Sequence, residues 1–194
     1  MNNTTIILAS ASPRRTELMT LAGITFTVVP ADICEDVLPG ETPSEHVMRL
    51  SRGKADAVAD GTPGRYVIGA DTVVVLDDLI MGKPVDDDEA FRMLSALSGR
   101  EHEVITGFTV FDKVNGIHLS RSVTTRVTFK ILGEHEIKRY IATGCPGDKA
   151  GAYAIQGGAV HFVRGINGSY TNVIGLPMTE LYETLCQLGA LDVD

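Results

Sequence analysis

The pattern of apolar and polar positions predicts that strands and helices alternate in the first half of the chain. Short apolar, β-branched runs are typical of buried strands, whereas apolar residues repeating every three to four positions indicate amphipathic helices. Two helix starts are marked, one by Ser12-Pro13 and one by Thr42-Pro43-Ser44-Glu45, which has capping-box spacing. The elements expected here are strands at 5–9, 25–29 and 66–70 and helices at 13–22 and 43–59.

The rest of the chain contains longer segments with many Thr and Val residues. The turn at 113–116 carries an Asn-Gly pair, which favours a hairpin between the segments that flank it. The expected elements are a short hairpin at 73–81, strands at 102–112, 117–131 and 160–164, helices at 86–97, 134–142 and 176–188, and a loop at 167–175. Alternating strands and helices of this kind predict an α/β fold.

Length and composition favour one domain over residues 1–194, with two lobes at most. The chain has 44% hydrophobic residues, which is enough for a well-packed core. No segment approaches the ~20 apolar residues that span a bilayer, and the apolar run at 6–11 is short and lacks a basic leader. We therefore expect a cytoplasmic protein. The cysteines are three in number without CxxC spacing, which predicts reduced, structural thiols.

The charge of the chain argues against binding to nucleic acids or to membrane surfaces. Its formal net charge is -8, and no dense run of Lys and Arg is present to replace counterions on a polyanion. The basic residues form small separated groups. They are either dispersed surface charges or, if folding brings several together, a site for one small polyanion.

Asp71 is the strongest candidate for chemistry. We expect the strand at 66–70 to end there, and ligand sites in α/β sheets gather beyond the carboxyl ends of strands. Gly69 and Ala70 are small enough to let a ligand approach. The alternative is an Asp that only opens a turn.

The start of the first helix breaks a local rule. Arg14 and Arg15 follow Ser12-Pro13 and fall in the first turn, where the helix dipole disfavours cations. A bound anion would resolve the conflict, because free amide groups, two guanidinium groups and the hydroxyls of Ser10 and Ser12 make a phosphate site. The alternative is two solvated arginines.

Two further positions could complete such a site. Glu35 lies in the irregular acidic segment 31–36, where its carboxylate could bind a hard cation or simply be solvated. Lys54 falls in the apolar stripe of the helix 43–59. Its ammonium group either extends to solvent or sits at the edge of a cleft as a partner for phosphate oxygens.

Small residues surround the remaining candidates. Lys83 lies in the tight turn Gly82-Lys83-Pro84, and the stretch 148–158 contains Lys149 and Gln156 among Gly and Ala. A flat ligand could lie against such a backbone, with the amide of Gln156 reading the edge of a base. The alternative is a glycine-rich loop between strands.

Taken in order, these motifs resemble those of the Maf family of nucleoside triphosphate pyrophosphatases, and the resemblance runs over nearly the whole chain. The family's fold is similar to that of inosine triphosphate pyrophosphatases. The resemblance therefore implies a long mixed β-sheet with surrounding helices, two lobes around a cleft, and a homodimer. The motifs that carry it are Ser10-Ala11-Ser12-Pro13-Arg14-Arg15, Gly69-Ala70-Asp71-Thr72, Gly82-Lys83-Pro84, Lys149-Ala150-Gly151-Ala152-Tyr153, Ile155-Gln156-Gly157 and Gly175-Leu176-Pro177.

The resemblance also implies a reaction and a role for each candidate. The reaction is hydrolysis of a nucleoside triphosphate to the monophosphate and pyrophosphate with a divalent cation, Mg²⁺ or Mn²⁺. Asp71 would accept a proton from water, and Glu35 would help to hold the metal. The basic positions that would neutralise the triphosphate are Lys54, Lys83 and Lys149.

Three positions track substrate choice within the family. Here they are Arg14, Thr72 and Gln156, a combination similar to the branch that acts on dTTP and UTP, including modified pyrimidine nucleotides. The spacing of small residues at 158–161 departs from many members of the family, which affects the expected loop geometry near Gln156.

Elementary chemistry agrees with this assignment. Attack on a phosphorus with dispersed negative charge needs cations and positioning more than covalent catalysis, so a metal, several Lys and Arg and one base are sufficient. A different hypothesis is a non-catalytic, nucleotide-binding regulator of cell division or septum formation, a role also associated with the family.

Overall fold

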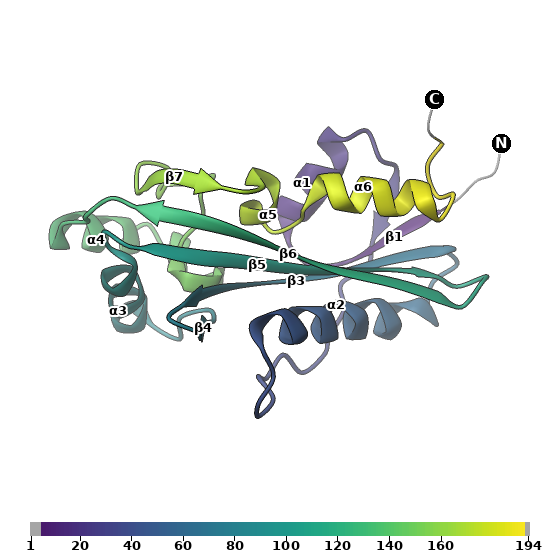
Figure 1. The fold of residues 1–194 in the computed structure, drawn as a ribbon, viewed down its shortest axis with the longest axis horizontal. Helices are drawn as coiled ribbons and strands as arrows, with labels where there is room; N and C mark the ends of the chain where they lie inside the picture. Colours follow the sequence, from purple (N-terminus) through teal and green to yellow (C-terminus); the bar gives the residue numbers. More distant parts are fainter. Residues whose placement is uncertain (1–4, 193–194) are drawn as a thin grey trace. The chain divides into compact units, whose positions relative to one another are not determined.

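The computed structural model describes residues 5–192 and contains one β-sheet with helices (Figure 1). The strands are β1 (Ile6–Ala9), β2 (Phe26–Val28), β3 (Tyr66–Leu76), β4 (Leu79–Met81), β5 (Glu101–Asp112), β6 (Ile117–Phe129) and β7 (Val163–Asn167). The helices are α1 (Pro13–Leu21), α2 (Pro43–Ala59), α3 (Asp87–Leu97), α4 (Glu134–Ile141), α5 (Tyr170–Ile174) and α6 (Met178–Gln187), with 3₁₀ turns η1 (Cys145–Asp148) and η2 (Ala150–Ala152).

The sheet has seven strands and is mixed. Its order is β2-β1-β3-β5-β6-β7, and β4 pairs with β3 off this path. β1 runs parallel to both β2 and β3, whereas the β3–β4 and β6–β7 pairs are antiparallel. The predicted α/β class with a long mixed sheet is therefore confirmed. Within residues 5–192, every helix is too short or too polar to cross a membrane.

The chain divides into two compact units. The first unit comprises residues up to 71, 106–123 and from 175 onward, and the second comprises 72–105 and 124–174. Strands β3, β5 and β6 each contribute residues to both units.

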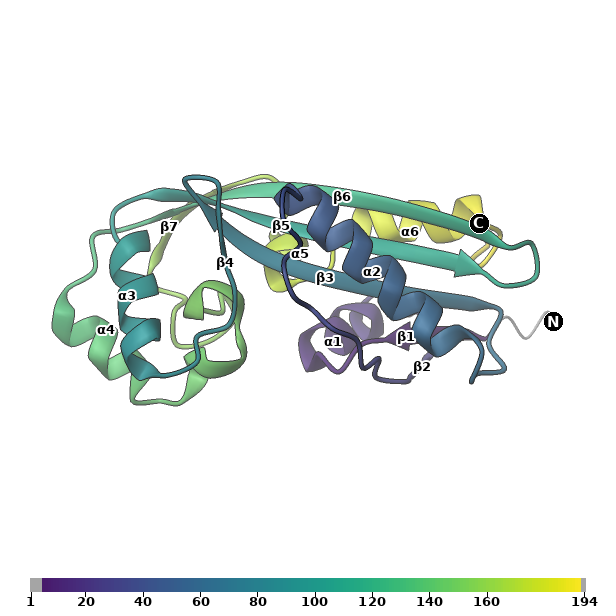
Figure 2. The same cartoon turned by 90° about the horizontal axis from the view of Figure 1, so that it is seen from below.

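In the first unit, α2 packs directly on the sheet, and two glycines allow this close approach (Figure 2). A Cβ atom at Gly69 would lie 2.0 Å from the carbonyl oxygen of Ser51, and one at Gly107 would lie 2.5 Å from that of Val47. Gly69 therefore gives room to the backbone of α2, where the sequence suggested room for a ligand. The predicted capping box is confirmed: Thr42 accepts from the Glu45 amide, and the Glu45 carboxylate accepts from the Thr42 amide.

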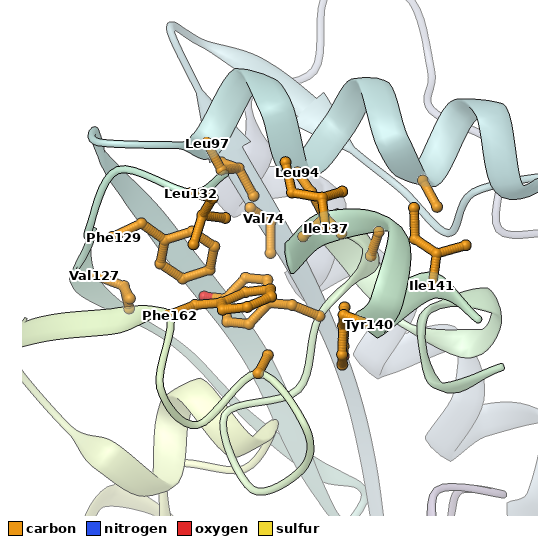
Figure 3. Packing of buried hydrophobic residues seen from close by; sticks show 14 of the residues in the cluster. Val74, Leu94, Leu97, Val127, Phe129, Leu132, Ile137, Tyr140, Ile141 and Phe162 are labelled. Carbon is orange, nitrogen blue, oxygen red and sulfur yellow. The ribbon is translucent and has the colours of Figure 1, made fainter. Parts of the chain in front are cut away.

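The second unit is built on an aromatic core (Figure 3). Phe129, Tyr140 and Phe162 are fully or nearly buried, and Phe162 makes edge-to-face contacts with the other two. His102 is buried among them, with Nε2 2.8 Å from the hydroxyl oxygen of Tyr153. Burial lowers the pKa of His102 to about 4, so the imidazole is neutral at pH 7.

The helix and strand predictions mostly match, with three corrections. The strand expected at 66–70 continues to Leu76, since β4 pairs with its second half. The last strand lies at Val163–Asn167 and was expected at 160–164. Within the expected loop at 167–175 there is a short helix, α5. It is too short for hydrophobic periodicity to mark it, and tertiary bonds hold it: the Asn172 amide group donates to the carbonyl of Val104 and the hydroxyl of Thr125.

Candidate functional site

The register of β1 and β3 places Asp71 inside the sheet, just beyond the end of β1. Ala9, the last residue of β1, pairs with Gly69, so Asp71 lies in β3 two residues beyond the point where β1 stops. The expectation that Asp71 ends its own strand is wrong. The carboxyl end that matters is that of the neighbouring parallel strand, β1, after which the chain turns away through Ser10 into α1. Asp71 is only 8% exposed.

Lys54 joins two carboxylates that are distant in sequence. It projects from the packed face of α2 and is 7% exposed. Its Nζ lies 2.7 Å from Oδ1 of Asp71 and 2.6 Å from Oε1 of Glu35. Of the two alternatives for this lysine, the structure has the buried one. A buried ammonium is tolerated only when it is paired, which explains why two carboxylates face it.

Arg15 is the second buried cation of this cluster. Its Nε donates to the carbonyl of Gly175 at 2.8 Å, and its Nη1 donates to the carbonyl of Ala70 at 2.8 Å and to the hydroxyl of Ser10 at 3.1 Å. Burial lowers the pKa of Arg15, and the nearby Asp71 carboxylate opposes this shift. A guanidinium group keeps its proton even so. The side chain therefore ties the end of β1, the middle of β3 and the segment before α6 around one positive charge.

The other residues of the predicted anion site lie at the start of α1. Arg14 is half-buried, unlike the buried Arg15 that follows it. The amide of Ser12 donates to the hydroxyl of Ser10 at 3.2 Å, and the side chain of Ser12 makes no capping bond. The first turn of α1 has no acidic residue. A helix start without an acidic residue and with two arginines in its first turn is suited to an anion.

The carboxylates of Asp71 and Glu35 fit a hard divalent cation. Both contact the Lys54 ammonium group, so the two carboxylates lie close enough together to ligate one cation beside it. Within residues 5–192 there is no group of three or more His, Cys, Asp or Glu residues that could hold a metal ion. Mg²⁺ commonly takes only one or two protein carboxylates and fills its shell with water and substrate phosphates. The donor set thus suits a cation that arrives together with a phosphorylated ligand.

The remaining predicted residues belong to the second unit. Thr72 follows Asp71 in β3, and Lys83 is exposed in the segment after β4. The Gly151 amide donates to the Gly82 carbonyl at 3.0 Å, so the turn that carries Lys83 is bonded to the segment that carries Lys149. Gln156 is exposed in a series of turns between η2 and β7.

Sequence reasoning missed the main-chain carbonyls that orient Arg15. The carbonyl groups of Ala70 and Gly175 carry no side-chain signal, although both residues lie in motifs that the sequence singled out. Gly175 has a φ of 123°, a conformation that favours glycine. This positive φ is the physical reason for glycine in Gly175-Leu176-Pro177.

Comparison with known proteins gives consistent matches over nearly the full length. The sequence model of the family described as Maf-like protein matches residues 5–188. A dTTP/UTP pyrophosphatase of Geobacter sp. (strain M21) is 58% identical over 191 residues, covering 98% of this chain and 99% of the relative. The dTTP/UTP pyrophosphatase of Geotalea uraniireducens is 57% identical over 187 residues, with 96% of each chain covered.

Among solved structures, the chain is similar to the Staphylococcus aureus Ham1 protein. The TM-score is 0.45 at 15% sequence identity, covering 64% of this chain and 71% of that one.

Proposed function

The chain belongs to the Maf family, and from this premise we propose that it is a nucleoside triphosphate pyrophosphatase that acts on dTTP and UTP. The products would be the nucleoside monophosphate and pyrophosphate, formed with the consumption of one water molecule. Identity of 57–58% to dTTP/UTP pyrophosphatases over almost the whole chain supports the substrate class.

The observation that carries this proposal is the cluster of Asp71, Lys54, Glu35 and Arg15 at the end of β1. Hydrolysis of a phosphoanhydride needs a base for water, cations for the phosphate charge and a fixed geometry. The cluster would supply all three from the buried side chains of Asp71, Lys54 and Arg15 and the exposed carboxylate of Glu35. A nucleophilic Ser or Cys is not required.

Each residue of the cluster has a proposed role. Lys54 donates to Oδ1 of Asp71. The other carboxylate oxygen, Oδ2, would accept the proton of the attacking water. Arg15 and Arg14 would face the phosphates together with the start of α1. A divalent cation bound by Glu35 and Asp71 would supply charge neutralisation at the phosphate oxygens.

Residues of the second unit would contribute to binding and choice of base. We propose that Lys83 and Lys149 neutralise phosphate charge and that Gln156 pairs with a pyrimidine edge through its amide. Thr72 would complete the substrate-discriminating set. A cytoplasmic location and a homodimer stay predictions, as do modified pyrimidine nucleotides as substrates.

The test is pyrophosphate release from a panel of nucleoside triphosphates with Mg²⁺ or Mn²⁺. The native chain should act on dTTP and UTP, and Asp71→Asn should lower turnover by about 100- to 10,000-fold, the usual contribution of a general base. Asn has the same shape as Asp, and Lys54 would still be paired with the Glu35 carboxylate. The variant should therefore still fold and unfold cooperatively. Gln156→Ala should keep turnover and redistribute activity among bases.

Two results would contradict the proposal. Near-normal turnover of Asp71→Asn would show that Asp71 is not the base in the reaction. Nucleotide binding without pyrophosphate release from any triphosphate would favour the non-catalytic regulator of cell division.

A further inference from the structure

Glu35 lies in a segment that has little structure of its own. Residues 29–42, between β2 and α2, form neither helix nor strand, and the Glu35 side chain is 44% exposed. The Glu35 carboxylate pairs with Lys54, but a side chain on a long irregular loop is placed reliably only when the main chain of that loop is tied to a regular element as well.

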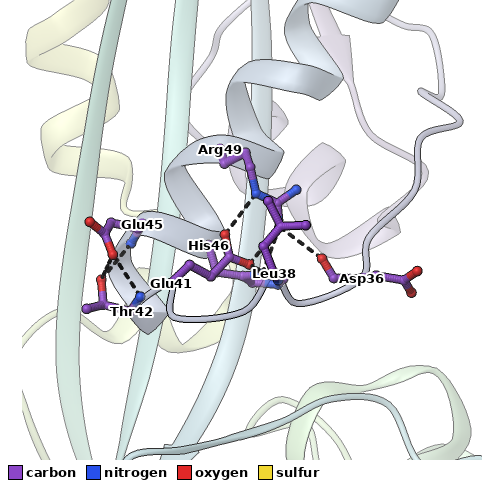
Figure 4. Close-up of polar contacts among 7 residues, drawn as sticks. All are labelled: Asp36, Leu38, Glu41, Thr42, Glu45, His46 and Arg49. Atoms are coloured by element: carbon purple, nitrogen blue, oxygen red, sulfur yellow. Dashed lines mark hydrogen bonds and ion pairs between the residues drawn. The ribbon is translucent and has the colours of Figure 1, made fainter.

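The loop is tied to α2 immediately after Glu35. Nη2 of Arg49 donates to the carbonyl oxygen of Asp36 at 2.9 Å (Figure 4). The Leu38 amide donates to Oε1 of Glu41 at 2.9 Å. On the other side of Glu35, Ile33 lies over Gly53, where an added Cβ would be 3.3 Å from the Ile33 side chain. Glu35 is thus held between two points on α2, at positions 49 and 53, next to Lys54.

Glu41 fixes the orientation of Arg49. Nε and Nη2 of Arg49 donate to the two oxygens of Glu41 at 2.8 and 2.7 Å, a paired geometry that lysine cannot reproduce. The arginine holds the pKa of Glu41 well below its usual range, so the carboxylate stays ionised at working pH. Nδ1 of His46 lies 2.6 Å from the same carboxylate and is buried beside it. Because Glu41 holds Nε and Nη2 of Arg49 in place, Nη2 also reaches the carbonyl oxygen of Asp36.

We propose that Arg49, oriented by Glu41, is a positioning residue that fixes the loop at Asp36 and thereby places the carboxylate of Glu35 against Lys54. The inference rests on the proposed function, because Glu35 matters only if it serves the reaction. Arg49 itself touches no reacting atom in this scheme. Its effect on activity must therefore pass through Glu35.

A double-mutant cycle tests that dependence. Arg49→Ala should lower kcat/KM about 10- to 100-fold in the native chain, as is typical when an outer residue that orients a metal ligand is lost. In a Glu35→Ala background the same substitution should change kcat/KM by less than about twofold, because sites coupled through one group are not additive. The variants Arg49→Lys and Glu41→Gln should have kcat/KM values between those of the native chain and Arg49→Ala.

Arg52→Ala is the matched control. Arg52 lies on the same helix, is 58% exposed and pairs only loosely with Asp56 at 3.7 Å. It should leave kcat/KM unchanged.

Hydrogen–deuterium exchange of the full chain gives a second readout that does not need activity. Arg49→Ala should speed exchange of the Leu38 amide, which donates to the Glu41 carboxylate that Arg49 pairs with, and leave the amides of β1 and β3 unchanged, whereas Arg52→Ala should match the native chain.

Equal losses in both backgrounds, or a native-like exchange profile in Arg49→Ala, would overturn the proposal. If Arg49→Ala does not fold, Arg49→Lys and Glu41→Gln carry the same test. A native chain that releases no pyrophosphate would refute the proposed function instead, and exchange alone would then decide whether Arg49 holds the loop.

Discussion

Both units of this chain bury apolar side chains, but they differ in the charged groups that they bury. The first unit buries Arg15, Lys54 and Asp71, each 8% exposed or less, where β1 stops beside β3. The second unit buries an apolar cluster in which Phe129 and Phe162 are at most 1% exposed. Buried charges are expensive even when paired, whereas buried aromatic rings stabilise a fold by their area alone. The first unit therefore carries an electrostatic cost that the apolar cluster of the second unit does not carry, and the proposed function would explain that cost.

The largest effect on stability should come from the aromatic cluster. Phe162→Ala should lower the free energy of unfolding by about 3–5 kcal/mol, because it leaves a cavity between Phe129 and Tyr140. Urea denaturation measures this change. The exposed Val160, at 63%, provides the control Val160→Ala, which should change stability by less than about 0.5 kcal/mol.

The activity of Phe162→Ala gives a second test of the difference between the two units. At a temperature where the variant is fully folded, its kcat for dTTP should stay within about twofold of the native value. A loss of kcat as deep as that of Asp71→Asn would break the division of roles between the units.

An effect on stability and activity together should come from the packing of α2. Gly69→Ala would place a methyl group 2.0 Å from the Ser51 carbonyl and 2.8 Å from the Ala55 amide, so the helix must shift. Overpacking of this kind costs about 1–3 kcal/mol. Because Lys54 lies between these two contacts, kcat should fall as well. Gly61→Ala, where no atom lies within 4 Å, should change neither quantity appreciably.

A smaller, pH-dependent effect should come from His102. Its folded pKa of about 4 lies below the ordinary value near 6.5, so protons bind the unfolded chain first. Stability is full above pH 6.5, decreases as the pH falls from 6.5 toward 4, and by pH 5 should be lower by about 2 kcal/mol.

Urea midpoints at pH 5–7.5 measure this slope. Asp112, whose pKa is lowered to about 2 chiefly by the Arg65 side chain, affects stability only at lower pH and does not obscure it. His102→Phe should remove most of the slope. An unchanged slope in this variant would show that another group carries it.

The local sequence was sufficient for most elements. Proline and a capping residue at 42–45, the Asp residues before α3 and the Asn-Gly turn each specify a helix start or a hairpin through bonds within a few residues. By contrast, α5 was missed because it is short and Asn172 within it is held by Val104 and Thr125, which are far away in sequence.

By itself, the sequence determined the α/β class and the family, because ordered motifs of Gly, Ser, Arg, Asp and Lys survive as a linear pattern. Only the tertiary structure decided that Asp71 lies inside a strand, that Lys54 bridges it to Glu35, and that Arg15 faces main-chain carbonyls. Strand register sets the position of Asp71, since β1 ends at Ala9 and β3 continues past it. Helix packing at Gly69 brings Lys54 to Asp71, and the backbone at Ala70 and Gly175 presents the carbonyls to Arg15. Contacts of this kind leave no periodic trace in the sequence.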